Sequence, residues 1–440
     1  MSTTHSTLAR RLDTKDAIVI GLGSMIGAGV FSAFAPAAKA AGAGLLIGLA
    51  IAAFIAFCNA TASAQLAATY PTSGGTYVYG REQLGPWYGF TAGWGFVIGK
   101  IASCAAMALT FASYAVPGPW WVQRLVAIVA VLALAGLNLR GVTRTALLTR
   151  ILVFCSLVAL AVLVLGIAFS GGADPSHLGS AGGWWSGGLY GILQSAGLLF
   201  FAFAGYARIA TMGEEVKDPS RVIPKAIAVA LAITVSIYLI VGVSVLLGAG
   251  PDQLAASTAP LAEAVRAAGV DTLVPVVALG GAFASLGALL ALITGIGRTG
   301  LAMARNRDLP KWLDAVHPRY GVPHHAEIAL AVVISVLVLT GDLRGVIGFS
   351  SFGVLVYYAI ANASAYTQPA EQRRWPRWLN ILGVAGCLIL VVTLPLTSVL
   401  AGLAMFAVGF ALRAFVLWRR RSHPPTGQEE GLARSDGSAS

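Results

Sequence analysis

The sequence predicts an all-α integral membrane protein with about twelve transmembrane helices. Of its 440 residues, 57% are hydrophobic and only 11% are charged, and the mean hydropathy is +0.79. A soluble domain carries about 25% charged residues, so this chain cannot cover a water-facing surface. Its apolar stretches reach the roughly 20 residues that a helix needs to cross a bilayer. The alternation over about ten residues that is typical of transmembrane strands does not occur.

Apolar runs between charged or Pro- and Gly-rich breaks define the expected spans. A segment of residues 1–16 precedes them and is expected to lie in the cytoplasm. The tail of residues 419–440 is polar and rich in Pro, Gly and Ser, so we expect it to be disordered and cytoplasmic. The expected spans are 17–40, 43–69, 88–116, 120–138, 146–170, 188–212, 222–249, 271–303, 326–341, 345–365, 378–395 and 397–418.

The distribution of basic residues predicts the orientation. With the N-terminus in the cytoplasm, the segments on that side collect twenty Lys and Arg residues. The opposite side holds Lys39, Arg124, Arg266 and Arg344. This positive-inside bias places both termini in the cytoplasm, and we expect the plasma membrane as the location. The net charge of +11 does not indicate a nucleic-acid partner, because no basic face interleaved with aromatic residues occurs.

Glycines in two of the spans predict helices that break inside the membrane. Span 1 carries GLGSMIGAG at residues 21–29, and span 6 carries Phe-Ala-Gly-Tyr at residues 203–206. The first run is no dinucleotide fingerprint, because Ile26 stands where the third glycine is required. Small residues in corresponding places of two halves are typical of inverted repeats with discontinuous helices, which line a cavity. The alternative is close helix packing, for which Gly23 and Gly27 have the spacing.

Residue types that support enzymatic or metal chemistry are scarce in the expected spans. The four cysteines lie singly in apolar spans and are interpreted as small core residues. The six histidines fall in termini or loops, and the spans offer no cluster of His, Asp or Glu. We therefore expect no enzyme, no metal site and no cofactor. An ion channel is disfavoured because neither a repeated filter nor a ring of like charges occurs.

Four stretches of the chain resemble the amino acid-polyamine-organocation transporter family, in particular its cationic amino acid transporter-like bacterial branch. The resemblance runs from about residue 12 to residue 420, and the two stretches at spans 6 and 8 are the most specific. The stretches are GLGSMIGAGVF (21–31), YPTSGGTYVYGREQLGP (70–86), FFAFAGYARIATMGEEVKDPSRVIPKAI (200–227) and RTGLAMARNRDLPKWLDAVHPRYGVP (298–323).

The resemblance implies a five-plus-five inverted repeat of the LeuT type, with discontinuous helices 1 and 6, that works by alternating access. The repeat would form a transport core of residues 17–365, followed by helices 11 and 12 in residues 378–418. In similar proteins the substrate carboxylate meets N–H groups of the unwound span 1, and the ammonium meets carbonyls of span 6. The matching positions are Met25, Ile26, Gly27, Ala28 and Gly29 in span 1 and Phe201, Ala202, Phe203 and Gly205 in span 6.

Further positions are carried over from the same resemblance. Ser103 matches a residue that lines the substrate pocket. Tyr206 is a candidate aromatic gate, although an aromatic side chain packed against neighbouring helices is an equal alternative. Glu214 is a candidate for an inner gate of ion pairs at the end of span 6, and a solvated loop residue is its alternative.

Departures from the family pattern concern the coupling ion. Members of this branch often carry a lysine midway through span 5, where Ser156 stands here. Other cations lie within spans, among them Lys100 in span 3 and Arg208 past the break of span 6. A charge inside a span usually faces a cavity or a partner. We expect Lys100 to contact the substrate carboxylate or to respond to protons, with a snorkelling or backbone-capping lysine as the alternative.

Arg208 is interpreted as a structural cation. Ser285 in span 8 keeps sodium coupling open as a further alternative.

The same departures predict the substrate class. Gly99 and Ala207 stand where relatives that carry dibasic substrates place acidic residues. We therefore expect a secondary active permease for neutral amino acids, working by proton symport or exchange. The alternatives are an amine or cationic amino acid permease and a non-transporting membrane amino acid sensor. The expected partners are the amino acid, a coupling proton and the lipid bilayer, and the sequence leaves the oligomeric state open.

Overall fold

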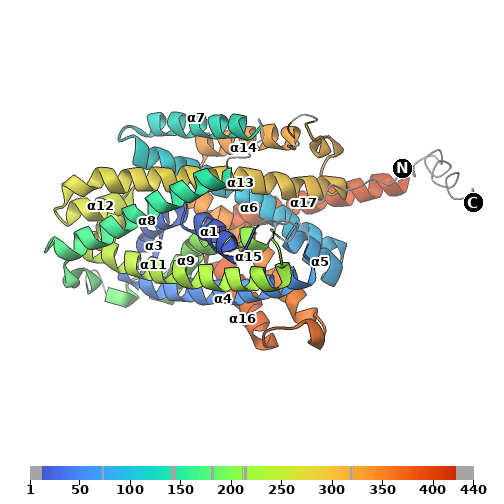
Figure 1. The fold of residues 1–440 in the computed structure, drawn as a ribbon, viewed down its shortest axis with the longest axis horizontal. Coiled ribbons are helices and arrows are strands. Elements are labelled where there is room, and N and C mark those ends of the chain that lie inside the picture. Colours follow the sequence, from blue (N-terminus) through green and yellow to red (C-terminus); the bar gives the residue numbers. More distant parts are fainter. Residues whose placement is uncertain are drawn as a thin grey trace, which may run out of the picture.

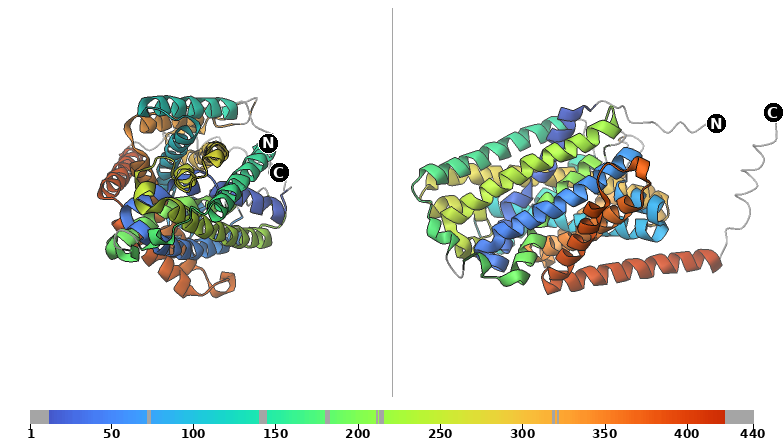
Figure 2. Two further views of the ribbon diagram at one scale, coloured as in Figure 1. Left: turned by 90° about the vertical axis from the view of Figure 1, so that its left-hand side faces the viewer. Right: turned by 90° about the horizontal axis from the view of Figure 1, so that it is seen from below.

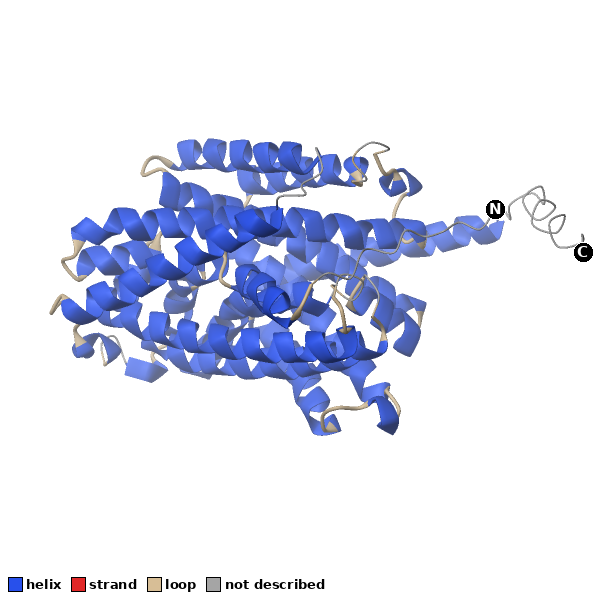
Figure 3. Cartoon of the chain, viewed as in Figure 1, coloured by secondary structure: helices blue, strands red, loops and turns tan. Residues whose placement is uncertain are grey.

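The computed structural model describes residues 12–422, except for residues 72–73, 140–144, 180–182, 211, 213–215, 318–319 and 321. This part of the chain is almost entirely helical, as Figure 3 shows, and it contains no strand. A single isolated bridge joins Leu12 to Val216, so the chain before span 1 lies beside the chain that follows span 6. The expected segments 1–16 and 419–440 fall mostly outside the described residues.

Seventeen α-helices make up the described part of the chain (Figure 1). In chain order they are α1 Thr14–Met25, α2 Ala28–Ser32, α3 Phe34–Ala41, α4 Leu45–Thr69, α5 Thr76–Leu84, α6 Pro86–Ala115, α7 Trp120–Leu139, α8 Thr145–Phe169, α9 Gly188–Phe203, α10 Ala207–Ala210, α11 Pro219–Ala256, α12 Pro260–Ala267, α13 Val274–Arg305, α14 His324–Thr340, α15 Leu343–Thr367, α16 Arg377–Thr393 and α17 Leu396–Ser422.

Within the described ranges, ten helical stretches are long and apolar enough to cross a membrane, and two shorter apolar helices, α14 and α16, accompany them. Together they confirm the predicted all-α membrane fold, and the two shorter helices lie where the remaining two of the twelve expected spans were predicted. Observed ends lie close to the expected ones; for example, the span expected at 120–138 is Trp120–Leu139. Two short helices between spans, α5 and α12, were not predicted.

Span 1 is interrupted in its middle. Helix α1 starts with a capping box, in which Asp13 accepts from the backbone of Asp16 and Asp16 accepts in return. It ends at Met25, because Ile26 has a non-helical backbone (φ −80°, ψ 63°), and α2 begins again at Ala28. A side-chain carbon on Gly27 would lie 2.6 Å from the Ala288 Cβ of α13. The glycine therefore serves both the break and close contact with a neighbouring helix.

Span 6 is interrupted at the expected place. Helix α9 ends at Phe203, a 3-10 turn covers Ala204–Tyr206, and the short helix α10 follows. Such a change of helical geometry leaves carbonyl groups that no longer bond within the α-helix. The two predicted breaks therefore both exist, five spans apart.

Helices α6 and α15 form the centre of the bundle and touch through glycines. A Cβ on Gly353 of α15 would lie 2.5 Å from the Gly95 oxygen of α6, and one on Gly99 would lie 3.2 Å from the Ser350 oxygen. Small residues allow this close approach of membrane helices. Helix α17 runs along the outside of the bundle in the right-hand view of Figure 2, while α7 and α14 lie side by side at another face.

Candidate transport site

The two broken spans touch each other through their backbones. A Cβ on Gly205 would lie 2.2 Å from the Ser24 oxygen, and a Cβ on Gly29 would lie 2.5 Å from the Ala202 Cα. Real side chains never approach backbone atoms so closely, so glycine is required at both positions. The break of span 6 therefore rests directly on the end of α1, and the start of α2 rests on α9.

Tyr238 of α11 connects the same two spans. Its buried hydroxyl lies 2.5 Å from the Met25 oxygen and 3.0 Å from the Ala202 oxygen, in donor geometry to both. A tyrosine hydroxyl has one proton, so the two carbonyls share a single donor. The carbonyl at the end of α1 and a carbonyl of α9 are in this way tied to one side chain of the neighbouring helix.

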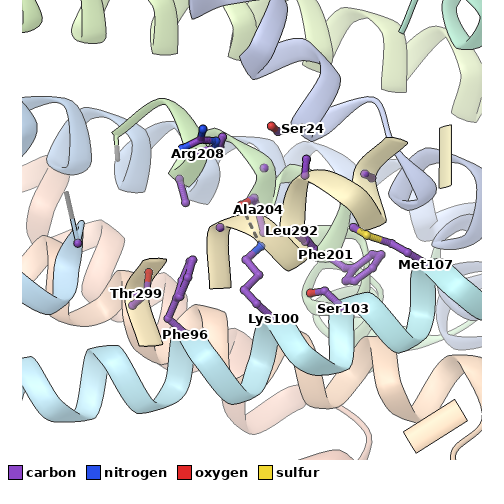
Figure 4. A pocket seen from close by; sticks show the side chains of 16 residues that line it. Ser24, Phe96, Lys100, Ser103, Met107, Phe201, Ala204, Arg208, Leu292 and Thr299 are labelled. Carbon is purple, nitrogen blue, oxygen red and sulfur yellow. Dashed lines mark hydrogen bonds between the residues drawn. The ribbon is translucent and has the colours of Figure 1, made fainter. Parts of the chain in front are cut away.

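A cavity lies beside the break of span 6, with about 760 Å³ of space that no atom fills, open solvent included. Figure 4 shows its wall, which α6, α13 and the chain around the break of span 6 supply. Its surface is mainly apolar, and among its described lining residues there is no Asp, Glu or His. The residues that line it are Ser24, Gly74, Phe96, Lys100, Ser103, Met107, Phe201, Ala204, Gly205, Ala207, Arg208, Ala288, Ala291, Leu292, Gly295 and Thr299.

Lys100 projects from α6 to the break of span 6. Its side chain is buried, with the residue 4% exposed, and Nζ donates to the Ala204 oxygen at 3.1 Å, the contact drawn in Figure 4. The Tyr358 hydroxyl of α15 donates to the same oxygen at 3.4 Å. This is the backbone contact that a capping lysine makes, but it is made beside a cavity and at a carbonyl that the break exposes. An ammonium carries three N–H donors, so this one bond does not use its full capacity.

The predicted substrate residues fall into two groups. Ser103, Phe201 and Gly205 line the cavity, and the Ser103 hydroxyl lies 2.6 Å from that of Ser350. The remaining candidates are buried and are not among the residues that line the cavity. These are Met25, Ile26, Gly27, Ala28, Gly29, Ala202 and Phe203.

The candidate gate Tyr206 does not line the cavity in this conformation. Tyr206 is fully buried and packs on Tyr358 with ring centroids 5.0 Å apart, and it is not a lining residue. Phe203 packs in the same way on Tyr238, at 5.0 Å. These are the packed positions that the sequence left open as the alternative. Glu214 lies outside the described residues.

The candidate coupling serines bond their own helices. Ser156 of α8 lines a second, smaller cavity with Ile26, and its hydroxyl donates to the Leu152 oxygen at 2.7 Å. The Ser285 hydroxyl of α13 donates to the Gly281 oxygen, also at 2.7 Å. Serines in membrane helices commonly bond the carbonyl four residues back. The hydroxyl of Ser156, at the position where the resemblance implies a lysine, therefore already donates its proton to its own helix.

Sequence reasoning missed a buried ion cluster around Asp308. The Asp308 carboxylate lies 3.1 Å from Nη1 of Arg413 in α17 and 3.5 Å from Nη1 of Arg81 in α5. It also accepts from the Tyr77 hydroxyl of α5 at 2.8 Å; burial, and then the Asp308 charge, raise the pKa of Tyr77, which stays a neutral donor. The Arg413 guanidinium lies 4.9 Å from the Trp87 ring. An arginine inside the expected span 397–418 was the signal that could have revealed this cluster.

Glu327 was missed as well, although it lies inside the expected span 326–341. It is 2% exposed on α14, and its Oε1 accepts from Asn138 Nδ2 of α7 at 2.8 Å. Thr294 of α13 donates to the same asparagine at 3.3 Å. Within the described residues, no group of three or more His, Cys, Asp or Glu side chains is placed to hold a metal ion.

Comparison with known proteins decides the family. The family model described as amino acid permease matches residues 12–411. The chain belongs to the amino acid permease family. This permease is 56% identical over 404 residues to an uncharacterized transporter of Mycobacterium tuberculosis. The matched region covers 92% of the permease and 90% of the relative.

The names of two more distant relatives state a substrate class. A branched-chain amino acid permease of Bacillus subtilis is 24% identical, covering 95% of this permease and 94% of its own chain. The chloroplastic cationic amino acid transporter 7 of Arabidopsis thaliana is 27% identical, covering 84% of this permease and 68% of its own chain. The resemblance predicted from four sequence stretches is thereby confirmed, and the permease is a multi-pass membrane transporter.

Proposed function

We propose that this permease carries neutral α-amino acids across the plasma membrane as a secondary active transporter that works by alternating access. The observation that carries the proposal is the cavity at the break of span 6, which offers a backbone carbonyl and a buried ammonium but no carboxylate among its described residues. The ammonium of a zwitterion can meet the Ala204 carbonyl, and its carboxylate can meet the Lys100 ammonium. A second positive charge on the substrate would instead face Lys100 without a counter-ion. Cationic cargo, as in the plant relative, is therefore disfavoured.

The conformation supports an inward-facing state. The cavity extends along α6 from Met107 to Phe96 and reaches Gly74, next to α5. The positive-inside distribution assigns that end of the bundle, and with it both termini, to the cytoplasm. Residues 25–29 lie behind the cavity wall. Their proposed role, in which N–H groups receive the substrate carboxylate, requires the two broken spans to separate as transport proceeds.

Coupling to protons and exchange remain the two proposed energy sources. Lys100 is the residue proposed to respond to protons, because Ser156 stands where the family resemblance implies a lysine and because a desolvated ammonium beside the cavity can lose its proton. The proposed division of the chain is a transport core of residues 17–365 followed by two helices in residues 378–418.

Uptake by proteoliposomes tests the function. The purified permease is reconstituted and given labelled neutral amino acids without sodium, with an inward proton gradient present or collapsed by an ionophore. Accumulation that depends on the gradient supports proton symport. Accumulation only in vesicles preloaded with amino acid supports exchange. Binding without flux in either format would favour the sensor, and uptake restricted to amines or cationic amino acids would favour the alternative permease.

Gly205→Ala tests in the same assay whether transport needs the contact between the broken spans, and Gly136→Ala is its matched control. The new Cβ would meet the Ser24 oxygen at 2.2 Å, so the contact between the broken spans must open. We expect uptake to fall to the background of empty vesicles. Gly136→Ala in α7 places a Cβ where nothing lies within 4 Å, and it should transport like the wild type. Normal uptake by Gly205→Ala would show that the contact between the two breaks is not needed for transport.

A further inference from the structure

The Ala204 carbonyl is a binding position for an ammonium group. It belongs to the 3-10 turn that interrupts span 6, it lines the cavity, and it accepts the Lys100 ammonium at 3.1 Å. In this structure the cation on the carbonyl is the Lys100 ammonium, which the protein itself supplies. A substrate ammonium entering the cavity meets a carbonyl that is already occupied by a cation of the same kind.

The described residues that line the cavity offer Lys100 no acidic partner. Among the described residues that line the cavity, the ionisable groups are Lys100 and Arg208, and both are basic. Figure 4 shows Lys100 rising from α6 to Ala204, with Arg208 on the α10 side of the cavity. A cation displaced from Ala204 inside this apolar space needs a new acceptor, because a buried charge without a partner is costly.

A zwitterionic ligand solves this problem and a simple cation does not. When an α-ammonium takes the Ala204 carbonyl, its own carboxylate can receive the displaced lysine ammonium, which sits on a flexible four-carbon stem. A primary amine brings a second positive charge to the same carbonyl and no acceptor. The Tyr358 hydroxyl, 3.4 Å from the Ala204 oxygen, keeps that oxygen hydrogen-bonded while the exchange occurs.

We infer that Lys100 is a specificity-determining residue that fills the ammonium subsite at Ala204 and admits only ligands whose carboxylate can take it over. Amines are excluded because they leave the lysine without a counter-ion, and cationic amino acids because their second charge faces it. This inference rests on the proposed transport of neutral amino acids. It differs from proton coupling, since it concerns which ligand displaces the lysine and not how the lysine titrates.

Ligand-induced thermal stabilisation of the purified permease tests the inference. The twenty proteinogenic amino acids are screened first, and the strongest neutral ligand is then compared with the primary amine that lacks its carboxylate. We expect the wild type to prefer the amino acid by about a hundredfold, since like charges placed together cost several kcal/mol. In Lys100→Met the ratio should fall by about tenfold or more, with tighter binding of the amine and of lysine.

Matched variants keep the result interpretable. Lys39→Met removes an exposed lysine from α3 and should bind like the wild type. If Lys100→Met does not fold, Lys100→Gln makes the same comparison, because its amide can still donate to Ala204 without a charge. An unchanged ratio in a folded, uncharged variant overturns the inference while leaving the proposed function intact. Failure of the wild type to bind any amino acid would overturn both.

Discussion

Two cations are buried among the described residues of the membrane-spanning helices of this permease, and their surroundings are opposite. Arg413 of α17 has an exposed side-chain fraction of 6%, pairs with Asp308 at 3.1 Å and lies against the rings of Trp87 and Phe90. Lys100 of α6 is equally buried but bonds one backbone oxygen, beside a cavity. The first charge is neutralised and enclosed, whereas the second is held by a neutral group at the edge of an open space.

The difference separates a structural charge from one available to a ligand. Arg413 joins α17, on the outside of the bundle, to the chain after α13 and, through Asp308, to Arg81 of α5. Removing Arg413 leaves the Asp308 carboxylate, whose side chain is 8% exposed, with only the more distant Arg81 as a cation. Removing Lys100 leaves no charge behind, because its partner is a carbonyl. The two cations should therefore differ in what their loss costs in stability and in what it changes in binding.

Arg413→Met should show the largest loss of stability. We expect the free energy of unfolding to fall by about 3–5 kcal/mol, because Asp308 loses its closest cation in a buried position. A thermal or denaturant unfolding transition of the purified protein in detergent measures the effect. The double variant with Asp308→Asn should recover much of the loss, and Arg266→Met, which breaks an exposed pair with Glu263, should change stability by less than about 1 kcal/mol.

Trp87→Leu should cause a loss of stability that is smaller than that of Arg413→Met, because it removes one contact of the arginine and not the charge. The residue is 44% exposed, and its ring contacts the Arg413 guanidinium at 4.9 Å as well as the rings of Phe90 and Phe410. We expect a loss of about 0.5–1 kcal/mol, the range for a cation–π contact near a surface. The same substitution in the Arg413→Met background should cost less. An equal cost in both backgrounds would mean that the ring acts through packing alone.

Lys100→Met should have the smallest effect on stability, a change of less than about 1 kcal/mol, because the Ala204 oxygen keeps the Tyr358 hydroxyl as a donor and no charge is left unpaired. The same unfolding assay measures it. Adding Tyr358→Phe removes both donors, and the double variant should then lose about 1–3 kcal/mol for an unsatisfied buried carbonyl. A loss for Lys100→Met as large as that of Arg413→Met would erase the distinction between the two cations.

Hydropathy and glycine placement predicted the spans and both breaks, because these depend on local sequence and on the bilayer. The partners of the two buried cations were beyond such reasoning. Lys100 and Ala204 are 104 residues apart, and Asp308 lies between α13 and α14 whereas Arg413 lies in α17, so these contacts arise only when the helices pack. Helix α5 was missed because Gly75 and Gly85, both with positive φ, bound a nine-residue segment with little apolar pattern. The direction of Tyr206 likewise depends on the position of Tyr358, on a helix far along the chain.

The hydroxyl of Tyr238 has a consequence for how the broken spans can move. It lies between the Met25 and Ala202 oxygens, and it has one proton to give. In the alternating access proposed above the two spans part, and this proton can then stay with only one of the two carbonyls, while the other must find a new donor. The end of α1 and helix α9 therefore compete for one hydrogen bond from α11, at a tyrosine that does not line the cavity.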